Sequence, residues 1–427
     1  MNLVRHYWRS VRASLWFVPV LMGAAAVLFA IAMLRWGLGL PDDETTFWLL
    51  YAGDTDNARE LLSTLLSGMV TMFSLVVSIT MVVLTLAAGQ IGPRLIHTFI
   101  QDRQTQFVLG LFLADIMYLL VVFRTIDGER VDSVPHLAVT GGTVLTALCL
   151  FVLLFYIHKL ARSIIYESVI RDVAAGLRRR SRHLLPEGKE SPPPPALGDD
   201  CAWIALGTDG YVQDINFATL VSCARRAGAV IRVEVRPGHY LLRRGEHVAV
   251  HPARACNDEL ADGIRGAFLL GSERTPTQDL EFGIRQMVEM ATRALSPGIN
   301  DVFTAVAVID SLSSSLGFIF ERGLEPSALC DEEGEVRVVR AVSDHEGIVG
   351  VAFDQIRHAG RGNPAILIRL TDAIARLAPY ATSDALRAPL VEQLDMVMAD
   401  GEKTLATPRE RTILRERHAD ARRRLSG

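Results

Sequence analysis

Four apolar runs within the first 160 residues constrain the fold of this chain more than any other feature of its sequence. They cover about residues 15–34, 61–88, 107–123 and 134–157. A helix rises about 1.5 Å per residue, so each run can cross a hydrocarbon core about 30 Å thick, the third only just. The sequence therefore predicts a transmembrane domain of four helices over residues 1–160.

The first apolar run has a basic start, as a cleaved signal peptide would have. Arg5, Arg9 and Arg12 precede it. Its apolar residues continue through 27–34, beyond the small residues 23–26. That length exceeds the apolar part of a secretory signal. We therefore interpret the first run as a membrane anchor that stays in the protein.

Charges in the flanking segments alternate along the chain and predict its orientation. The N-terminal tail carries arginines and no acid, and the loop after the first run is acidic. The segment after the fourth run, from Lys159 to Arg182, is strongly basic. Loops rich in lysine and arginine stay on the cytoplasmic side of a membrane. We therefore expect both the N-terminus and the C-terminal domain to be cytoplasmic.

The second apolar run carries hydroxyl side chains at helical spacing. Six of them fall on one face of a helix: Ser63, Ser67, Thr71, Ser74, Ser78 and Thr85. Small hydroxyl residues let membrane helices approach one another and form hydrogen bonds. The same set would also make a polar wall along a pore or solute path. The sequence leaves both interpretations open, and we refer to these six residues as the hydroxyl stripe.

Asp115 lies at the midpoint of the third apolar run. A carboxylate at that depth costs about 2.5–3.5 kcal/mol on insertion scales unless it is paired or neutral. None of the four runs contains a lysine or arginine to pair with it. Two hypotheses follow: Asp115 binds a cation or relays protons, or it is a protonated acid that donates a hydrogen bond between helices.

A proline-rich stretch, Ser191–Pro195, separates the membrane domain from a cytoplasmic module. We expect residues 161–197 to form a basic juxtamembrane segment and a stiff linker. Short β-prone runs between glycine and proline turns then predict a small β-rich unit over residues 198–256, either a partial barrel or a plain β-meander. The expected strands are 211–215, 230–235, 240–242 and 247–250, with a helix at 217–226 after the first.

Residues 257–427 are predicted to be a helical domain of about six helices. Capping residues indicate where the helices begin: Thr275 in a capping box with Pro276, Asn300 or Asp301, Ser343, Asn363, Ser383 and Thr407. The overall fold class is thus an α-helical membrane domain followed by a cytoplasmic α+β domain.

The first helix of this domain repeats charged residues every four positions, at Arg285, Glu289 and Arg293. Such spacing is typical of a solvated face with ion pairs along the helix. The alternative is a docking or anion-binding surface, to which Asn300 and Asp301 at the start of the next helix would contribute.

The sequence contains no motif that indicates catalysis. It has no nucleophile elbow, phosphate-binding loop or metalloprotease motif, and its histidines and five cysteines do not have metal-ligand spacing. We therefore expect no cofactor and no metal, and nothing indicates an enzyme. Proteins that bind nucleic acid need a basic face, and the net charge of this chain is −4. We therefore expect no nucleic-acid partner.

Two stretches of the chain resemble a known family. One is 73–126, with the sequence SITMVVLTLAAGQIGPRLIHTFIQDRQTQFVLGLF at its centre, and the other is 274–305, RTPTQDLEFGIRQMVEMATRALSPGINDVFTA. They are similar to bacterial predicted membrane proteins catalogued as domain of unknown function 2254. The resemblance implies a multi-pass protein of the bacterial inner membrane with this layout. It implies no activity and no catalytic residues.

Two functions are compatible with these features. The first is a homo-oligomeric channel or transporter for ions or small solutes, in which the hydroxyl stripe and Asp115 line the path. The alternative is a membrane-anchored sensor or scaffold whose cytoplasmic domain binds a partner or small ligand. In both, the lipid bilayer is a partner of the N-terminal domain.

Overall fold

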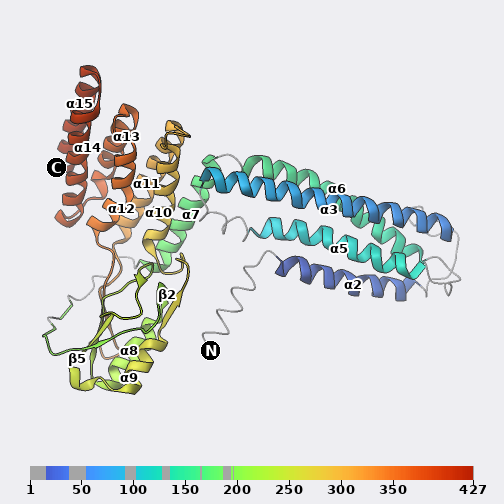
Figure 1. Cartoon of the computed structure of the whole chain (residues 1–427), viewed down its shortest axis with the longest axis horizontal. Helices are drawn as coiled ribbons and strands as arrows, with labels where there is room; N and C mark the ends of the chain where they lie inside the picture. The colour runs from blue at the N-terminus through green and yellow to red at the C-terminus, as the bar shows by residue number, and fades with distance from the viewer. Residues whose placement is uncertain are drawn as a thin grey trace. The chain divides into compact units, whose positions relative to one another are not determined.

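The computed structural model describes residues 16–37, 54–91, 102–126, 135–163, 166–185, 194–195 and 197–426. The chain forms two compact units, residues 1–166 and 167–427, and each is considered by itself (Figure 1). Several segments used in the sequence analysis lie outside the described residues. They are the N-terminal arginines, Leu15, the loops between the apolar runs, Val134 and most of the proline-rich linker.

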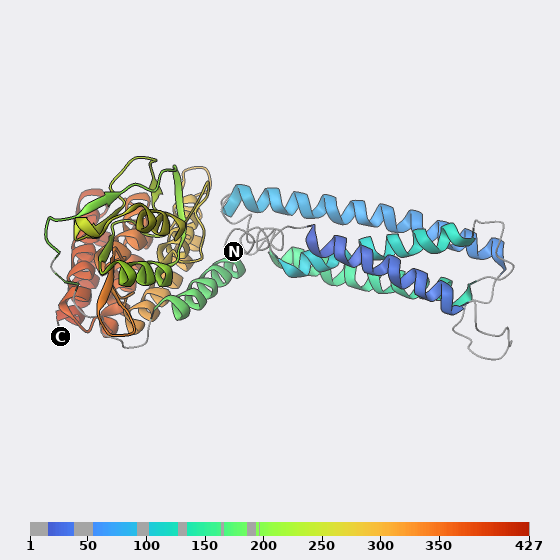
Figure 2. The ribbon, with the colours of Figure 1, turned by 90° about the horizontal axis from the view of Figure 1, so that it is seen from below.

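The N-terminal unit consists, in its described part, of long helices that run alongside one another (Figures 1 and 2). They are α2 (Phe17–Gly37), α3 (Thr55–Ile91), α5 (Arg103–Ile126) and α6 (His136–Ser163). Each helix covers nearly all of one predicted apolar run. Helix α5 packs against the other three helices, and its buried residues therefore occur on every side of it.

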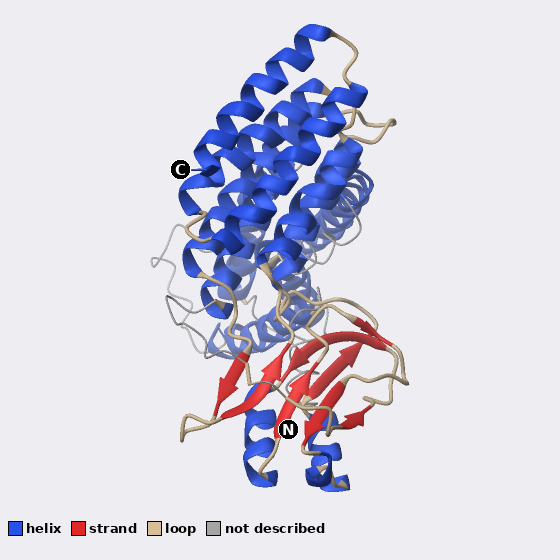
Figure 3. Ribbon diagram, turned by 90° about the vertical axis from the view of Figure 1, so that its left-hand side faces the viewer, coloured by secondary structure: helices blue, strands red, loops and turns tan. Residues whose placement is uncertain are grey.

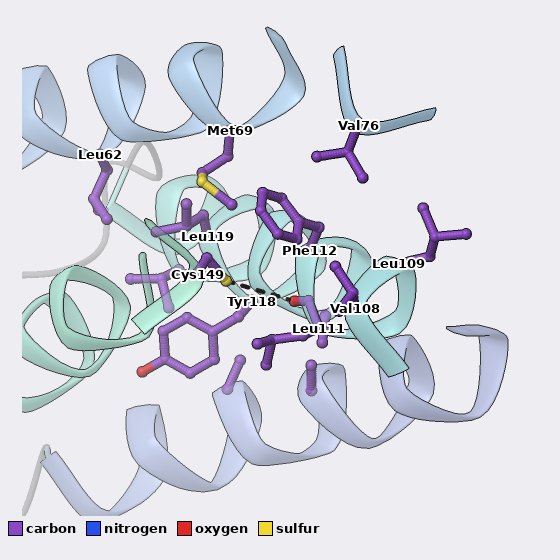
Figure 4. Close-up of a cluster of buried hydrophobic side chains, with 14 of the residues drawn as sticks. Leu62, Met69, Val76, Val108, Leu109, Leu111, Phe112, Tyr118, Leu119 and Cys149 are labelled. Atoms are coloured by element: carbon purple, nitrogen blue, oxygen red, sulfur yellow. Dashed lines mark hydrogen bonds between the residues drawn. The ribbon is translucent and has the colours of Figure 1, made fainter. Parts of the chain in front are cut away.

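The interior of this unit is apolar and tightly packed (Figure 4). Helix α3 contributes one edge, in which Leu62, Met69 and Val76 are seven residues apart and almost fully buried. These side chains point toward Phe112 and Leu119 of α5 (Figure 4). Seven residues are close to two helical turns, so the repeat keeps a single narrow edge of α3 against α5.

Glycines bring α6 close to α5. A Cβ atom on Gly141 would lie 2.8 Å from the hydroxyl oxygen of Tyr118, and one on Gly142 would lie 2.9 Å from a methyl carbon of Leu119. Lipid tails are as apolar as the helix surface, so helices in a membrane associate largely through such close packing.

Five described helices are long and apolar enough to cross a membrane. Four of these segments lie in the N-terminal unit: Phe17–Arg35, Thr55–Thr85, Arg103–Ile126 and His136–Leu160. The fifth, Val302–Arg322, is helix α11 of the C-terminal unit. The apolar character of the first four agrees with a multi-pass membrane protein, and α11 was expected only as a helix of the α+β domain.

The segment after α6 contains a helix that the sequence analysis did not anticipate. Helix α7 (Tyr166–Leu184) covers much of the range predicted as a juxtamembrane segment and linker. Its apolar side chains, such as Ile170, Val173 and Leu177, are buried in the C-terminal unit. A Cβ atom on Gly283 of the neighbouring helix α10 (Leu280–Ala294) would lie 3.1 Å from the Leu177 side chain. The sequence analysis did not recognise this amphipathic pattern, because α7 is rich in arginine.

Two β-sheets form one layer of the C-terminal unit (Figure 3). The larger has the order β1-β5-β3-β8-β7 and the smaller has the order β4-β2-β6. The strands are β1 (Ala202–Ile204), β2 (Gly210–Ile215), β3 (Val230–Val233), β4 (Tyr240–Leu241), β5 (Val248–His251), β6 (Phe268–Gly271), β7 (Ala328–Cys330) and β8 (Val336–Arg340).

The four expected strands correspond to β2 to β5, but their arrangement differs from both predicted forms. Strand β3 pairs with β5 in antiparallel and with β8 in parallel orientation. Because β8 comes about 100 residues later in the chain, the sheet is neither a small barrel nor a meander of consecutive strands. Three strands, β6 to β8, lie within the range 257–427 that was predicted to be helical.

Helices cover both faces of the sheet layer (Figures 1 and 3). On one face are α8 (Phe217–Ala227) and α9 (Asp258–Gly266). On the other is a helical layer that corresponds to the six predicted helices: α10, α11 (Val302–Arg322), α12 (His345–Ala359), α13 (Pro364–Leu377), α14 (Asp384–Thr404) and α15 (Pro408–Ser426). Short 3-10 turns occur at Ala253–Ala255 and Ala378–Tyr380.

The cap predictions for these helices have mixed outcomes. Asp301 and Asn363 cap α11 and α13, and Thr407 with Glu410 forms the predicted capping box of α15. The prediction for Thr275 was wrong, because α10 begins at Leu280 and its N-cap is Asp279. Helix α12 is likewise capped by Asp344, the residue after the predicted Ser343.

We predict that α7 is required for the stability of the C-terminal unit. A fragment of residues 166–427 should melt cooperatively, whereas one of residues 198–427 should melt at a lower temperature because it lacks α7. In the longer fragment, Leu177→Ala should cost about 2–5 kcal/mol, as truncation of a buried leucine does. The exposed Arg179 offers a control, and Arg179→Ala should change stability by less than about 0.5 kcal/mol. Equal melting of the two fragments, measured by circular dichroism, would contradict the prediction.

Candidate functional site

Asp115 is fully buried in the N-terminal unit, at the contact between α5 and α6. Thr146 of α6 donates a hydrogen bond to its Oδ2 atom, with an O–O distance of 2.9 Å. The Oδ1 atom is also buried and has no hydrogen-bond partner among the described residues. Those residues give the carboxyl no basic partner either, as the sequence had indicated.

The surroundings of Asp115 hold further buried polar groups. The Tyr118 hydroxyl donates to the Ala138 carbonyl oxygen at 2.9 Å. The Cys149 thiol lies 3.9 Å from the Leu111 carbonyl oxygen, the contact drawn as a dashed line in Figure 4. These bonds connect α5 to α6, so the polar groups around Asp115 also hold two helices together.

The hydroxyl stripe lies on the other side of the unit's packing. All six stripe residues are exposed, whereas the buried edge of α3 is formed by Leu62, Met69, Val76 and Val83. At 100° per residue, the centre of the stripe is opposite this edge. Thr71 and Thr85 donate to carbonyl oxygens one turn earlier in α3, at 2.9 and 2.8 Å. The stripe therefore points away from the helices with which α3 packs.

The structure does not bring Asp115 and the hydroxyl stripe together within one chain. The carboxyl group is enclosed by α5 and α6, and the stripe is on the outer face of α3. Instead, two other polar contacts connect the helices. Thr80 of α3 and Tyr156 of α6 are joined by a hydrogen bond of 2.7 Å, and Asp102 at the start of α5 forms an ion pair with Lys159 near the end of α6.

In the C-terminal unit, the charged residues that repeat every four positions on α10 follow a buried acid, Glu281. Arg285 binds Glu281, one turn earlier, with an N–O distance of 2.7 Å. Glu289 and Arg293 follow on the same partly exposed face. The side chain of Glu281 is only 3% exposed, so this end of the face belongs to the interior of the unit.

Glu281 is the centre of a polar cluster that joins three segments. Arg236, after β3, lies 2.8 Å from its carboxylate, and Ser343, before α12, donates to it at 2.9 Å. Arg236 also donates to Ser343 at 2.8 Å. Burial raises the pKa of Glu281, but the bonds from Arg285, Arg236 and Ser343 outweigh it and hold the pKa below its ordinary value.

The neighbouring Asp279 responds differently to similar burial. It binds Arg274 at 2.7 Å and caps α10 through the backbone N–H of Phe282. Its burial outweighs the attraction of Arg274, so the pKa of Asp279 is raised. Gly238 is close to this pair, because a Cβ atom there would lie 2.2 Å from the carboxylate of Asp279. The charged groups of the cluster pair with one another within the protein, which indicates a structural role.

The loop between α10 and α11 carries the other two predicted surface residues. Asp301 caps α11 by accepting from the backbone N–H of Thr304 at 3.1 Å. Asn300 has a φ of 49°, a left-handed conformation that asparagine tolerates better than most residues. Its neighbours include exposed apolar side chains, with Phe303 87% and Ile299 41% exposed. Asp301 thus shapes this loop as a helix cap and Asn300 shapes it through its left-handed backbone conformation.

The sequence analysis missed a basic groove of about 460 Å³ in the C-terminal unit. It is lined by Arg182, His183, Leu184, Leu185, Arg322, Pro326 and Arg340. These residues come from the ends of α7 and α11 and from β8, which are far apart in the sequence. The run of arginines at the end of α7 was the one available signal, and it was interpreted as a juxtamembrane charge.

Comparison with known proteins agrees with the membrane character of the chain. Residues 12–376 match the family described as "Predicted membrane protein (DUF2254)". The chain is 27% identical over 427 residues to the uncharacterized protein Rv1290c of Mycobacterium tuberculosis, an alignment that covers 95% of this chain and 79% of the relative. The uncharacterized protein Mb1321c of Mycobacterium bovis matches with the same identity and coverage.

No solved structure matches the chain. The family match extends from the first apolar helix into α13 and so includes helices of both units. The chain therefore belongs to the DUF2254 family of predicted membrane proteins, as the two stretches that resemble this family indicated.

Proposed function

We propose that this protein spans the bacterial inner membrane four times, assembles with copies of itself, and forms a channel or transporter for ions or small solutes. The hydroxyl stripe is the observation that carries the proposal. Six hydroxyl residues occupy the one face of α3 that lies opposite its packed edge. A second copy of the chain can cover this face, and the N-terminal units of the two copies then enclose polar groups between them.

The proposal assigns the four crossings to α2, α3, α5 and α6 and excludes α11. Helix α11 has sufficient length and hydropathy, but its apolar residues Val308, Leu312 and Leu316 are fully buried in the C-terminal unit. Its Asp310 lies 2.9 Å from Arg376 of α13. A helix whose apolar face is already covered by protein gains little from entry into lipid.

Both ends of the chain are assigned to the cytoplasm. The basic residues before α2 and after α6 support this orientation, and so does the acidic loop between α2 and α3. With an even number of crossings, the C-terminal unit lies on the same side as the N-terminus. This placement gives the C-terminal unit access to cytoplasmic ligands and partners.

Assembly accounts for a polar face on an otherwise apolar membrane helix. Thr71 and Thr85 already use their hydroxyl hydrogens within α3, which lowers the cost of exposing them to lipid. Their oxygen lone pairs and the serine hydroxyls of the stripe remain able to bind water or a partially dehydrated ion. Several α3 helices arranged around an axis would present these groups to a common path.

Asp115 has a different position in this proposal. Its carboxyl group binds Thr146 and lies in the packed interior, so we assign it to the contact between α5 and α6. A role in cation or proton transfer would require a path that reaches the α5–α6 contact. The Asp115→Asn variant separates the structural role from the transfer role.

A second function, a membrane-anchored sensor, is favoured by the basic groove. A groove of about 460 Å³ falls within the size range of small-molecule sites, roughly 300–1,000 Å³. In this alternative, the membrane helices hold the C-terminal unit at the bilayer, and binding of a ligand in the groove is the primary event.

The topology can be tested by labelling introduced cysteines in whole cells. Cysteines in place of Asp43 and Asp127 should react with a membrane-impermeant thiol reagent, because both positions are assigned to the periplasm. A cysteine in place of Arg103 should react only after the cells are broken. The unsubstituted protein is the blank, since its own cysteines lie in the membrane or the cytoplasm in this topology. Labelling of the Arg103 variant in intact cells would reverse the orientation.

Flux measurements test the role of the hydroxyl stripe. Proteoliposomes that contain the protein should pass ions detectably faster than empty vesicles, as measured with ion-sensitive dyes. Thr71→Val and Ser74→Ala together should reduce that flux several-fold, because they remove hydroxyls from the path at little change in volume. Thr143→Val is the matched control, since Thr143 is an exposed hydroxyl residue on α6. Wild-type vesicles no leakier than empty ones, across several ions and pH values, would reject the channel proposal.

Asp115→Asn distinguishes a structural from a conducting carboxyl group. Asparagine keeps the size and a hydrogen-bond acceptor for Thr146, so the variant should match the wild type in melting temperature, oligomeric state and flux. Asp115→Leu leaves the Thr146 hydroxyl without its partner and should lower stability by about 1–3 kcal/mol. If Asp115→Asn abolishes flux while the protein stays folded and assembled, the carboxyl group belongs to the conduction path.

A further inference from the structure

The loop between α10 and α11 presents apolar side chains at the surface of the C-terminal unit. Phe303, in the first turn of α11, is 87% exposed, more than Phe155 of the membrane helix α6 at 76%. Pro297 and Ile299 of the loop are exposed as well. We refer to Pro297, Ile299 and Phe303 as the apolar tip. Large apolar side chains gathered at one point of a surface are typical of contact with another protein or with a membrane.

The backbone around the apolar tip is held by hydrogen bonds of its own. The N–H groups of Ile299 and Asn300 both donate to the Ser296 carbonyl oxygen, at 3.0 and 2.9 Å. The N–H group of Asp301 donates to the Ala294 carbonyl oxygen at 2.7 Å. These donors therefore need no water, and a segment with satisfied backbone donors can enter the edge of a bilayer at lower cost.

Helix α11 runs in the same direction as α7, and contacts between the two helices fix their register. Arg178 of α7 donates to the Ser314 hydroxyl of α11 at 3.4 Å. One turn later, the guanidinium group of Arg182 lies 5.7 Å from the centre of the Phe318 ring. Both pairs are 136 positions apart in the sequence, so the two helices advance together.

This register places the apolar tip beside the start of α7. At an offset of 136, Phe303 is level with position 167, in the first turn of α7. Helix α6 ends at Ser163, three positions before α7 begins. Three residues span at most about 10 Å, and packed helices lie about 8–10 Å apart. The chain therefore keeps the tip within roughly 25 Å of the end of α6, a helix long and apolar enough to cross a membrane.

We propose that the apolar tip contacts the bilayer that α6 crosses, with Phe303 and Ile299 in the headgroup region. The bilayer is the favoured occupant because α6 brings a lipid surface within reach of the tip, whichever end of the protein is cytoplasmic. Attachment of this kind becomes stronger with the apolar area that enters the interface. The tip then gives the C-terminal unit a second attachment to the membrane besides α6. The inference rests on α6 as a membrane crossing and is independent of conduction.

Photo-crosslinking of the full-length protein in phosphatidylcholine proteoliposomes tests the contact. With the photoreactive analogue benzoylphenylalanine in place of Phe303, irradiation should give phospholipid adducts that mass spectrometry detects. The same replacement of Phe155 tests α6 as a crossing and sets the yield expected of a residue in lipid. The same replacement of Tyr240, an exposed aromatic residue of β4, should give no lipid adduct. If Phe155 gives the adduct and Phe303 gives no more than Tyr240, the proposal is overturned.

A charge added to the tip provides a second test. In the chain that carries the photoreactive group at position 303, Ile299→Asp should reduce the lipid adduct several-fold, because it places a carboxylate in the interface. Leu242→Asp makes the same change at an exposed apolar residue beside β4 and should leave the yield unchanged. An equal yield in both variants would contradict the contact. So would adducts with a second copy or with another segment of this chain in place of lipid.

Discussion

The bilayer offers no water to unpaired polar groups, and the N-terminal unit is organised by this constraint. Three of its hydrogen bonds join polar groups on different helices: Asp115 with Thr146, Tyr118 with the Ala138 carbonyl oxygen, and Thr80 with Tyr156. Each bond joins α6 to α5 or α3. Gly141 and Gly142 of α6 lie against Tyr118 and Leu119 and so let α6 approach α5 closely. The same constraint makes the exposed hydroxyl stripe noteworthy, because no other described helix covers those residues.

Local sequence signals identified the helices of the N-terminal unit and strands β2 to β5, because long apolar runs indicate the helices and short β-prone runs between turns indicate the strands. Helix α7 was missed because arginines dominate its composition, although Leu177 and its apolar neighbours follow helical spacing. Strand β8 was missed for another reason. Its antiparallel partner β7 lies just before it, across a turn that contains Gly334, and the sequence analysis did not use that turn. Its parallel partner β3 precedes it by about 100 residues, and no local signal indicates a pairing at that separation.

The candidate sites show the same division between local and distant information. The hydroxyl stripe and Asp115 could be selected from the sequence, since helical spacing and membrane depth are local properties. Their separation within the unit could not, because it depends on which edge of α3 meets α5. The basic groove combines Arg182 with Arg322 and Arg340, residues up to about 160 positions apart that belong to α7, α11 and β8, and only the tertiary fold brings them together.

The stretch from Arg274 to Arg285 carries part of the resemblance to the family, and its contacts show how the C-terminal unit is held together. Gln278 binds both the backbone N–H and the carbonyl oxygen of Ile215 in β2, at 2.9 and 3.1 Å. Asp279 caps α10, and Glu281 binds the segments that follow β3 and β8. Twelve residues thus connect the small sheet, the large sheet and the helical layer. A buried carboxylate with two arginine partners is costly to disrupt, because removal of either partner leaves charge in the interior. The charged residues of this stretch are therefore best explained by the joining of layers, which directs the search for ligand binding to the basic groove.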